Sequence, residues 1–478
     1  MKGETDGRRR TTRKSTRRVS SPAEALNWPS RALAGKPEDN RDGGDAKKRP
    51  LKLASPNFVI SQRERLVMHK VKAHSLTGRI TSRLMRQAFQ AVRRNRGAAG
   101  VDKVSIRMFE SNLDDNLAAL MRQLKAGTFR PLPLRRVHIS KGPGTKKLRP
   151  LGIPVVRDRV AQEVIRRLLA PIFEPQFHEN SFGFIPGRNC HQAIERVLEF
   201  HREGHRVVLD ADIQGFFDNL SHRVIMETVA DQVADGNILR LVEKFLTAGV
   251  MEDGVFKPTT IGTPQGGVIS PLLANIVLNR LDWQLHAAGF RFARYADDFV
   301  VVCQDHRQAQ EALQLVQRVL ENELGLALSP EKTKTTTYGK GYDFLGFHLS
   351  SRSRRMRDKS VQKFKAKVRE LTLRHCNLDL EAIEKLNRVI RGTGNYFATG
   401  FSTCRWTFQK LDSWIRMRLR AMKLKRKNYN DNHKLRMGYF RRQLGLLTLE
   451  QFCTYRDQHG QARQVIPRHE ATSVGVAR

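Results

Sequence analysis

The sequence predicts an α+β core with an antiparallel sheet, followed by an all-helical and strongly basic domain. From residue 131 to 349, short apolar strands alternate with amphipathic helices, a mixture typical of α+β proteins. Beyond residue 350, apolar residues recur at helical spacing, and residues 351–427 carry 22 Lys and Arg against 6 Asp and Glu. The length of 478 residues suits two or three domains.

The expected domain boundaries follow from these changes in composition. The first 50 residues hold 14 Lys and Arg and 7 Asp and Glu without an apolar period, as in disordered tails. We therefore expect a disordered basic tail, a mixed core, a helical domain and a C-terminal tail, over residues 1–60, 75–350, 351–450 and 451–478.

The individual elements are predicted from apolar spacing. The expected helices start near Ser75 and near Gln214 and span Ile106–Ala126, Val156–Phe173, His191–His201, Leu272–Leu285 and His306–Leu324. The expected strands are Arg136–Ile139, Arg206–Asp212, Arg291–Ala296, Phe299–Cys303 and Phe344–Leu349.

The net charge of +39 indicates a polyanionic partner, because self-repulsion of this size opposes a compact fold. Nucleic acid is the expected partner, and charge alone leaves an enzyme and a simple coating protein equally open. Five scattered cysteines without a CxxC pair disfavour a zinc ribbon or a disulfide framework. No apolar stretch approaches a membrane span, so no membrane partner is expected.

An acidic pair, Asp297-Asp298, is flanked by apolar strand-like residues, which predicts a β-hairpin with the carboxylates at its turn. Carboxylates held on rigid strands bind Mg²⁺, although a solvated turn is the commoner use of Asp. A second strand ends in Asp210 and Asp212, and alternation places these two on one face. Two metal ions could bridge the two strands, while helix capping remains the alternative for Asp210.

A glycine-rich loop at residues 262–271 precedes the predicted helix Leu272–Leu285. Its adjacent glycines let the backbone approach a ligand closely, and Gln265 offers both a donor and an acceptor. Next to a polymerase site, such a loop suits contact with an incoming nucleotide, although an ordinary connecting loop is the commoner explanation when the segment is taken alone.

In this order, seven segments resemble the motifs of group II intron reverse transcriptases. The matching segments are residues 147–154, 180–188, 212–218, 263–267, 295–298, 326–334 and 344–347. The resemblance covers roughly residues 75–450 and implies a right-hand polymerase fold with fingers, palm and a helical thumb. It implies two Mg²⁺ ions, with Mn²⁺ as a substitute, and dNTPs as substrates.

Site residues follow from the matching positions. The resemblance implies catalytic and metal-binding roles for Asp212, Asp297 and Asp298, and Ile213 is a further expected metal-binding residue. Nucleotide contacts fall on Lys147, Arg149, Phe217, Gln265, Gly266 and Lys332, and primer or template contacts on Tyr295 and Arg188. Phe217 would exclude a ribose 2′-hydroxyl unless it only packs beside Phe216, and Lys334 rivals Lys332 as the general acid.

The basic C-terminal region resembles the maturase domain of the same family, on residues 386–397 and 411–415. Thr393 departs from the family, which more often has Trp there. The resemblance implies binding of group II intron RNA, with phosphate contacts expected from Arg416, Arg418, Arg420, Lys423, Lys425 and Arg426. No endonuclease domain with cysteine pairs is expected.

The sequence thus predicts an RNA-directed DNA polymerase that assists intron splicing and moves the intron by target-primed reverse transcription. A splicing-only RNA-binding maturase and a retron or defence reverse transcriptase are the alternatives. Intron RNA, a DNA target with its primer, and dNTPs are the expected partners, and homodimerisation is left open. We expect the protein in the bacterial cytosol or nucleoid, with an organelle as the alternative.

Overall fold

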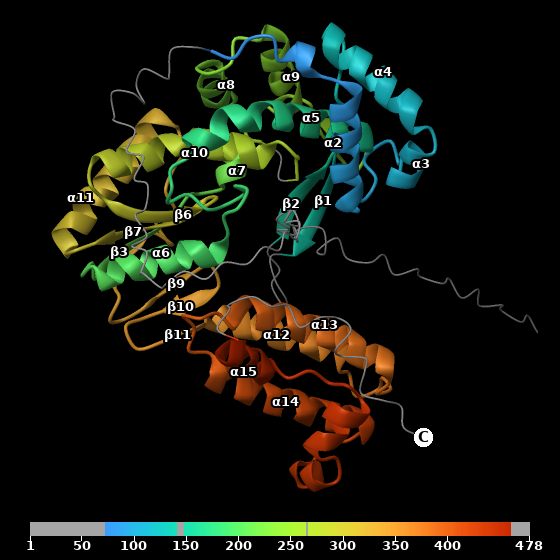
Figure 1. Cartoon of the computed structure of the whole chain (residues 1–478), viewed down its shortest axis with the longest axis vertical. Coiled ribbons are helices and arrows are strands. Elements are labelled where there is room, and N and C mark those ends of the chain that lie inside the picture. The colour runs from blue at the N-terminus through green and yellow to red at the C-terminus, as the bar shows by residue number, and fades with distance from the viewer. Residues whose placement is uncertain (1–71, 141–147, 264–265, 460–478) are drawn as a thin grey trace, which may run out of the picture.

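The computed structural model describes residues 72–140, 148–263 and 266–459. A larger unit of helices and sheets is joined to a smaller helical unit through a small sheet (Figure 1). The predicted tail at 1–60 lies outside the described residues, as does most of the predicted tail at 451–478. Across the described ranges, no helix is long and apolar enough to cross a membrane.

The first part of the larger unit packs helices beside a four-stranded sheet of order β2-β1-β4-β5. Strands β1 and β2 are antiparallel, and β4 joins β1 in parallel. The helices are α2 (Ser82–Arg94), α3 (Ile106–Glu110), α4 (Leu113–Ala126) and α5 (Val156–Phe173). The strands are β1 (Leu134–Ser140), β2 (Leu148–Ile153), β4 (Val250–Glu252) and β5 (Val255–Lys257).

The second part is built on an antiparallel sheet of order β6-β7-β3-β8. Its strands are β3 (Val207–Asp212), β6 (Arg291–Tyr295), β7 (Asp298–Cys303) and β8 (Lys334–Thr337). Its helices are α6 (Cys190–Arg202), α7 (Phe216–Asn219), α8 (His222–Ala230), α9 (Gly236–Leu246), α10 (Ser270–Ala287) and α11 (His306–Gln317).

This central sheet is buried on both faces. In β3, Leu209 faces a core shared with α5 and α8–α11, whereas Val208 faces a second core shared with α6 and the C-terminal helices. Strand β7 alternates in the same way, with Val301 in the first core and Val300 in the second. Burial on both faces explains why the two strands read as continuous apolar runs rather than as an alternating pattern.

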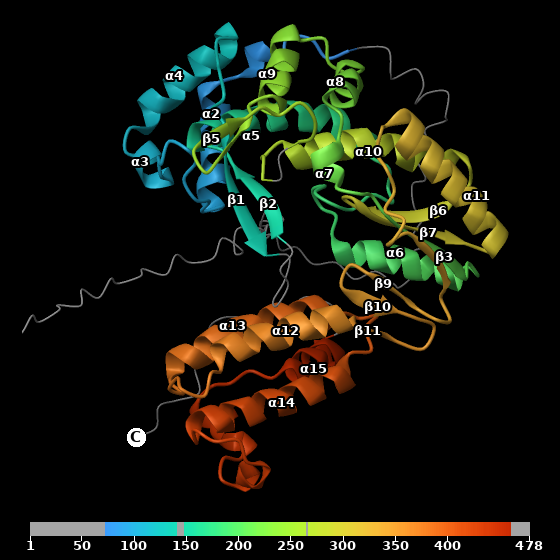
Figure 2. The same cartoon turned by 180° about the vertical axis from the view of Figure 1, so that it is seen from behind.

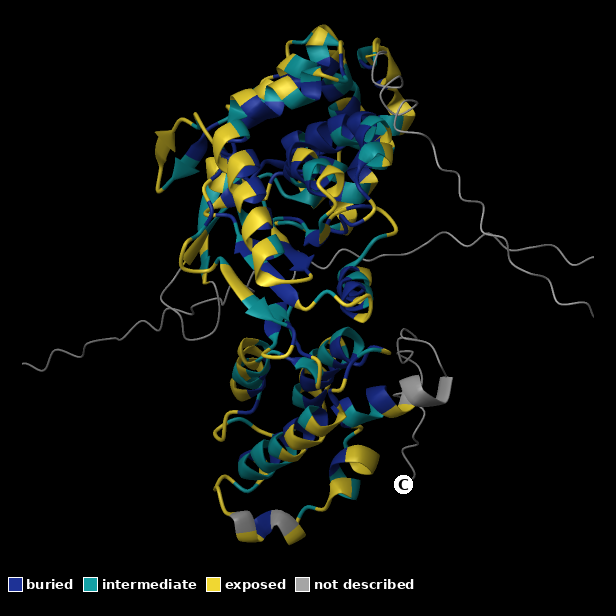
Figure 3. Ribbon diagram, turned by 90° about the vertical axis from the view of Figure 1, so that its left-hand side faces the viewer, coloured by how far each residue is buried: buried dark blue, intermediate teal, exposed yellow. Residues whose placement is uncertain are grey.

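The C-terminal unit follows a three-stranded sheet of order β11-β10-β9. In both views α12 and α13 lie between the larger unit and α14 (Figures 1 and 2). Buried residues lie on the inner sides of its helices and exposed residues on the outside (Figure 3). The elements are β9 (Tyr342–Phe344), β10 (Phe347–Leu349), β11 (Arg354–Met356), α12 (Asp358–Leu371), α13 (Leu380–Phe397), α14 (Arg405–Lys423) and α15 (Leu449–His459).

The mixed helix and sheet architecture is confirmed, with three differences in the predicted helices. The helix expected from Ser75 begins only at Ser82, where the Thr81 side chain accepts a hydrogen bond from the Leu84 amide. The helix expected over Ile106–Ala126 is interrupted at residues 111–112, because the Asn112 backbone leaves the helical region. The helix expected to reach Leu324 ends at Gln317 and continues as π-helix.

The single strand predicted over Phe344–Leu349 is wrong, because it is a hairpin of β9 and β10. Leu345 and Gly346 form its turn, with φ of 46° and 85°. Two positive φ angles are what a tight two-residue hairpin turn requires. The periodicity of the apolar residues could not separate one long strand from two short ones.

The buried residue His178 should make the stability of the fold depend on pH in the acid range. Its ring is buried against Trp283, His286 and Phe292, and its Nδ1 accepts a hydrogen bond from the Asn180 amide at 3.0 Å. Burial, followed by repulsion from neighbouring cations, lowers the pKa of His178 from 6.5 to about 3. The unfolded chain therefore takes up a proton first, and stability present above pH 6.5 is lost as the pH falls towards 3.

We therefore expect the melting temperature to fall between pH 7 and pH 4.5, and a His178→Asn variant to show a smaller part of that fall. Charge repulsion over the rest of the molecule acts on both proteins equally, so the difference between their plots of melting temperature against pH isolates the effect of His178. Parallel plots for the two proteins would contradict this prediction.

Candidate active site

The structure brings Asp212, Asp297 and Asp298 together where β3 ends beside the turn between β6 and β7. Asp212 stands directly opposite Asp298 in the antiparallel pair of β3 and β7. Directly opposed residues have Cβ atoms about 4.5–5.5 Å apart. Asp297 lies in the two-residue turn that precedes Asp298. Carboxylates separated by 84 residues in the sequence therefore share one edge of the sheet.

The turn that carries Asp297 is strained. Tyr295 pairs with Asp298, which leaves only Ala296 and Asp297 as the turn. Ala296 has φ of 60°, a conformation that a hairpin turn normally gives to glycine. A side chain in that region costs about 1–3 kcal/mol, and it persists where the surroundings hold it in place.

Two lysines form ion pairs with two different carboxylates of β3. The Lys332 Nζ is 2.6 Å from Asp212 Oδ2, and the Lys334 Nζ is 3.7 Å from Asp210 Oδ2. The sequence left these two lysines as equal candidates for the general acid. Only Lys332 contacts one of the three candidate metal ligands, so the geometry favours Lys332.

The carboxylates are crowded by protein atoms and by one another. Desolvation by burial, followed by repulsion from Asp210, raises the pKa of Asp298 to about 7. Asp298 nevertheless lies at the solvent-exposed end of β7. Desolvation also raises the pKa of Asp297, against the opposing charges of Arg149 and Lys332. A bound cation would relieve both the desolvation and the repulsion.

The site fits Mg²⁺ by its donor chemistry but is not a complete protein cage. Over the ranges that the structure describes, no three His, Cys, Asp or Glu side chains form a ready metal cluster. Mg²⁺ commonly takes one or two carboxylates and completes its shell with water and substrate phosphates, so such a cage is not required. Ile213 is buried and forms an isolated β-bridge with Leu328. Its side chain has no donor atom for a metal ion, so only its main-chain carbonyl could be a ligand.

The glycine-rich loop packs closely against the candidate nucleotide-binding elements. The Thr263 amide donates to the Phe217 carbonyl at 2.7 Å. Gly266 has φ of 114°, and a Cβ there would overlap the carbonyl oxygen of Gly152 at the end of β2. Arg149, in the same strand, is close enough to lower the pKa of Asp297. Lys147 and Gln265 lie outside the described residues.

Phe217 is half-buried and lies edge-on to Phe216, with 5.1 Å between ring centroids. It packs against the first core, so the structural role that the sequence allowed is present. Its carbonyl contact with the glycine-rich loop also places it beside that loop. The two roles are compatible, and sugar discrimination stays a prediction.

The two candidate primer or template residues differ in their surroundings. Tyr295 is half-buried beside the exposed Phe184, with 6.4 Å between ring centroids. The Arg188 guanidinium donates to the carbonyls of His178 and Ser181 at 2.5 and 2.6 Å. Arg188 therefore braces the loop before α6, a role that the sequence pattern did not reveal.

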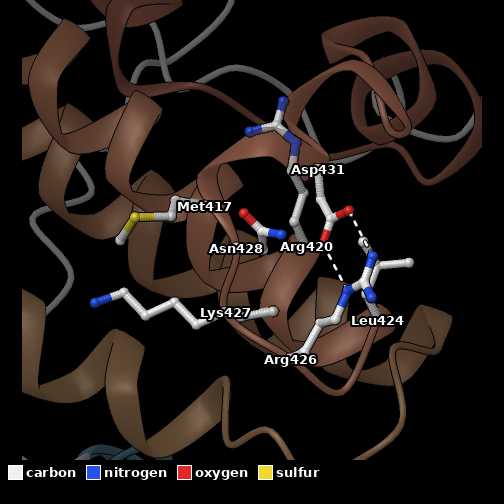
Figure 4. A pocket seen from close by; sticks show the side chains of 8 residues that line it. Met417, Arg420, Leu424, Arg426, Lys427, Asn428 and Asp431 are labelled. Atoms are coloured by element: carbon white, nitrogen blue, oxygen red, sulfur yellow. Dashed lines mark hydrogen bonds and ion pairs between the residues drawn. The ribbon is translucent and has the colours of Figure 1, made fainter.

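In the C-terminal unit, Arg420 and Arg426 line a small pocket and both make contacts within the chain (Figure 4). Arg426 forms two hydrogen bonds with Asp431, at 2.9 and 2.8 Å. Arg420 donates to the Leu435 carbonyl at 2.9 Å, and its guanidinium lies 5.6 Å from the centre of the Phe440 ring. These two candidate RNA contacts thus also hold the segment after α14 in place.

Two further candidates fix the end of α12 and the segment after it. Arg418 donates to the hydroxyl and the carbonyl of Thr372, at 3.0 and 2.6 Å. Lys425 donates to the Cys376 carbonyl at 2.7 Å. The two remaining candidates are the half-buried Arg416 and the exposed Lys423. The basic pattern therefore combines residues that brace the unit with residues that remain accessible.

Lys332 and Lys334 give a testable contrast. We predict that Lys332→Ala lowers kcat for primer extension about a hundredfold, because a positioned general acid contributes about 10²–10⁴-fold. Lys334→Ala should change kcat only about threefold. The Lys332–Asp212 pair is exposed, and the exposed Lys334 lies 3.7 Å from a largely buried Asp210. Pairs with a solvent-exposed lysine contribute little stability, so both variants should melt close to wild type. Equal losses of kcat in the two variants would contradict the assignment.

The fold and site define a class: a template-directed nucleotidyltransferase with its carboxylates on an antiparallel sheet. Residues 139–349 match the family model "Reverse transcriptase (RNA-dependent DNA polymerase)", and residues 361–440 match "Group II intron, maturase-specific domain". The chain therefore belongs to the group II intron-encoded reverse transcriptases and maturases, as the sequence motifs predicted.

Individual relatives agree with this assignment. Protein YkfC of Escherichia coli (strain K12) is 36% identical over 288 residues, which cover 52% of this chain and 75% of YkfC. Group II intron-encoded protein LtrA of Lactococcus lactis subsp. cremoris is 30% identical over 325 residues, which cover 54% of this chain and 53% of LtrA. This chain thus spans about half of LtrA and three quarters of YkfC.

Among solved structures, a telomerase from Candida albicans in complex with a fragment of telomeric RNA matches with a TM-score of 0.37 and 14% identity. The match covers 68% of this chain and 64% of the telomerase chain. A TM-score this low supports no inference about this protein.

Proposed function

We propose that this chain copies RNA into DNA with two Mg²⁺ ions, or Mn²⁺ in their place, held by Asp212, Asp297 and Asp298. The pairing of Asp212 with Asp298 beside the Asp297 turn carries this proposal. The ions would supply charge stabilisation for an in-line phosphoryl transfer. The primer 3′-hydroxyl would lose its proton to water as its oxygen attacks the α-phosphorus, the bond to pyrophosphate would break, and Lys332 would give the leaving pyrophosphate a proton.

The nucleotide would lie between β2 and the glycine-rich loop. Arg149 is exposed in β2 and suits a triphosphate, because its guanidinium binds phosphate oxygens in a fork geometry. Gly266 brings the loop backbone against Gly152 in the same strand. Phe217, beside the loop, would exclude a ribose 2′-hydroxyl. Lys147 and Gln265 are added to these nucleotide contacts from the sequence motifs alone, because both lie outside the described residues.

The C-terminal unit, residues 351–450, would act as thumb and maturase and grip the intron RNA. Its net positive charge favours phosphate contacts. Together with the polymerase site at 75–350, it would support splicing of the intron and then target-primed reverse transcription at a DNA site. The bacterial cytosol or nucleoid is the proposed location.

Primer extension tests this function. The purified chain, an RNA template, a DNA primer, dNTPs and Mg²⁺ should give DNA products of template length, and EDTA should abolish them. Addition of the chain to the intron precursor RNA should also accelerate splicing at low salt. Accelerated splicing without any extension would instead favour the splicing-only alternative, and extension without intron RNA binding would favour a retron or defence enzyme.

A further inference from the structure

A completely buried arginine lies directly behind the turn that carries Asp297. Arg294 in β6 and Asp282 in α10 are both fully buried. The guanidinium donates to both Asp282 carboxylate oxygens, at 2.7 and 2.5 Å, and to Asn275 Oδ1 at 2.9 Å. Asn275 and Asp282 are two helical turns apart, so they present their side chains on the same side of α10. A buried ion pair is seldom a better stabiliser than apolar packing, which points to a further role.

The same arginine holds the strained turn. Its Nη1 also donates to the carbonyl oxygen of Ala296 at 2.9 Å. Asn275 donates to the Gly183 carbonyl at 2.8 Å, and Gly183 lies so close to Ala296 that a Cβ would overlap its backbone nitrogen. The backbone at residues 180–182 also holds Arg294. The Arg294 amide donates to the Asn180 carbonyl, and the Phe182 amide donates to the Arg294 carbonyl.

We propose that Arg294, oriented by Asp282 and Asn275, is a positioning residue that holds the Ala296 turn and thereby places the Asp297 carboxylate for metal binding. Ala296 would otherwise relax from its positive φ, because a residue with a Cβ disfavours that conformation. Arg294 touches neither substrate nor metal and acts through the backbone of the turn. The inference deepens the proposed function and rests on its metal site.

The test separates positioning from stability. The double substitution Arg294→Met with Asp282→Leu removes both buried charges and fills the space with apolar side chains, an exchange that commonly preserves folding. It leaves the Ala296 carbonyl without its Arg294 donor. Arg280→Met is the matched control, because Arg280 lies on the same helix and pairs with Glu323 at an exposed site.

Two quantities are measured beside the melting temperature. One is the dissociation constant of the free protein for Mn²⁺, by electron paramagnetic resonance, and the other is the Mg²⁺ concentration that gives half-maximal primer extension. If the double variant populates the binding-competent turn about a tenth of the time, both values rise about tenfold. The control should leave both unchanged. Adding Ala296→Gly to the double variant should restore part of the affinity, because glycine adopts positive φ freely.

A folded double variant with unchanged Mn²⁺ affinity would overturn the proposal. If the double variant does not fold, Asn275→Ala decides instead, because it keeps the ion pair and removes only the amide that joins Arg294 to Gly183. It should raise the Mn²⁺ dissociation constant about threefold, and an unchanged constant would again overturn the proposal. Absence of primer extension in wild type, with the expected Mn²⁺ shifts in the variants, would refute the proposed function and leave the positioning role intact.

Discussion

Replacement of Asp297 by Asn should lower RNA-templated primer extension about a thousandfold or more. The substitution keeps the shape of the side chain but removes the negative charge that a divalent ion needs, and loss of one preorganised electrostatic group commonly costs about 10²–10³-fold. Loss of a metal ligand in a two-ion site should exceed that range. Single-nucleotide extension at saturating dNTP gives the rate constant directly.

The matched control for this substitution is Asp253→Asn. Asp253 is exposed at the turn between β4 and β5, with φ of 50°, a conformation that Asn tolerates as readily as Asp. It should retain wild-type extension, and both variants should bind intron RNA like wild type. Extension by Asp297→Asn at a tenth of the wild-type rate would exclude Asp297 as a metal ligand.

Replacement of Gly266 by Ala should raise KM for dNTP about tenfold or more and lower kcat. The new Cβ would meet the Gly152 carbonyl oxygen in β2, and it would also add strain at φ of 114°. Backbone atoms cannot move aside cheaply, so the loop must leave its position against Gly152 of β2. Steady-state kinetics on a homopolymeric RNA template measures both constants.

The control Gly254→Ala distinguishes the effect of the contact with Gly152 from the effect of backbone strain at a positive φ. Gly254 also has a positive φ, of 85°, but a Cβ there has nothing within 4 Å. A similar melting temperature for the two variants, with a kinetic defect only in Gly266→Ala, is the expected result. Equal kinetics would mean that the close approach of the loop to β2 has no part in nucleotide binding.

Three of the four strands of the central sheet were predicted within one residue of their observed bounds, because each is a local pattern, but β8 (Lys334–Thr337) was not predicted. The helix Val156–Phe173 was predicted with its observed bounds. The order of the motifs also located the carboxylates, because a resemblance carries positions along the chain. What local pattern could not supply was pairing over long distances, such as that of Lys332 with Asp212.

The roles of the basic residues were the least predictable part. A sequence does not distinguish an arginine that forms hydrogen bonds within the chain from one that is available to bind phosphate. Arg418, which donates to Thr372, and Arg416 illustrate this. No role was predicted for Arg294, because a strand pattern does not show whether an arginine side chain faces solvent or a buried partner. The available signal was Asn275 and Asp282, two polar residues one heptad apart that lie among the buried apolar residues of α10.

The double burial of β3 and β7 ties the two halves of the molecule into one cooperative body. Val208 and Val300 belong to the same apolar cluster as Leu411 and Ile415 of α14. A fragment that stops before α12 would leave one side of the carboxylate-bearing strands without much of its apolar cover. We therefore expect the unit proposed to copy RNA and the unit proposed to bind it to unfold together, and intron RNA bound to the helices to stiffen the strands as well.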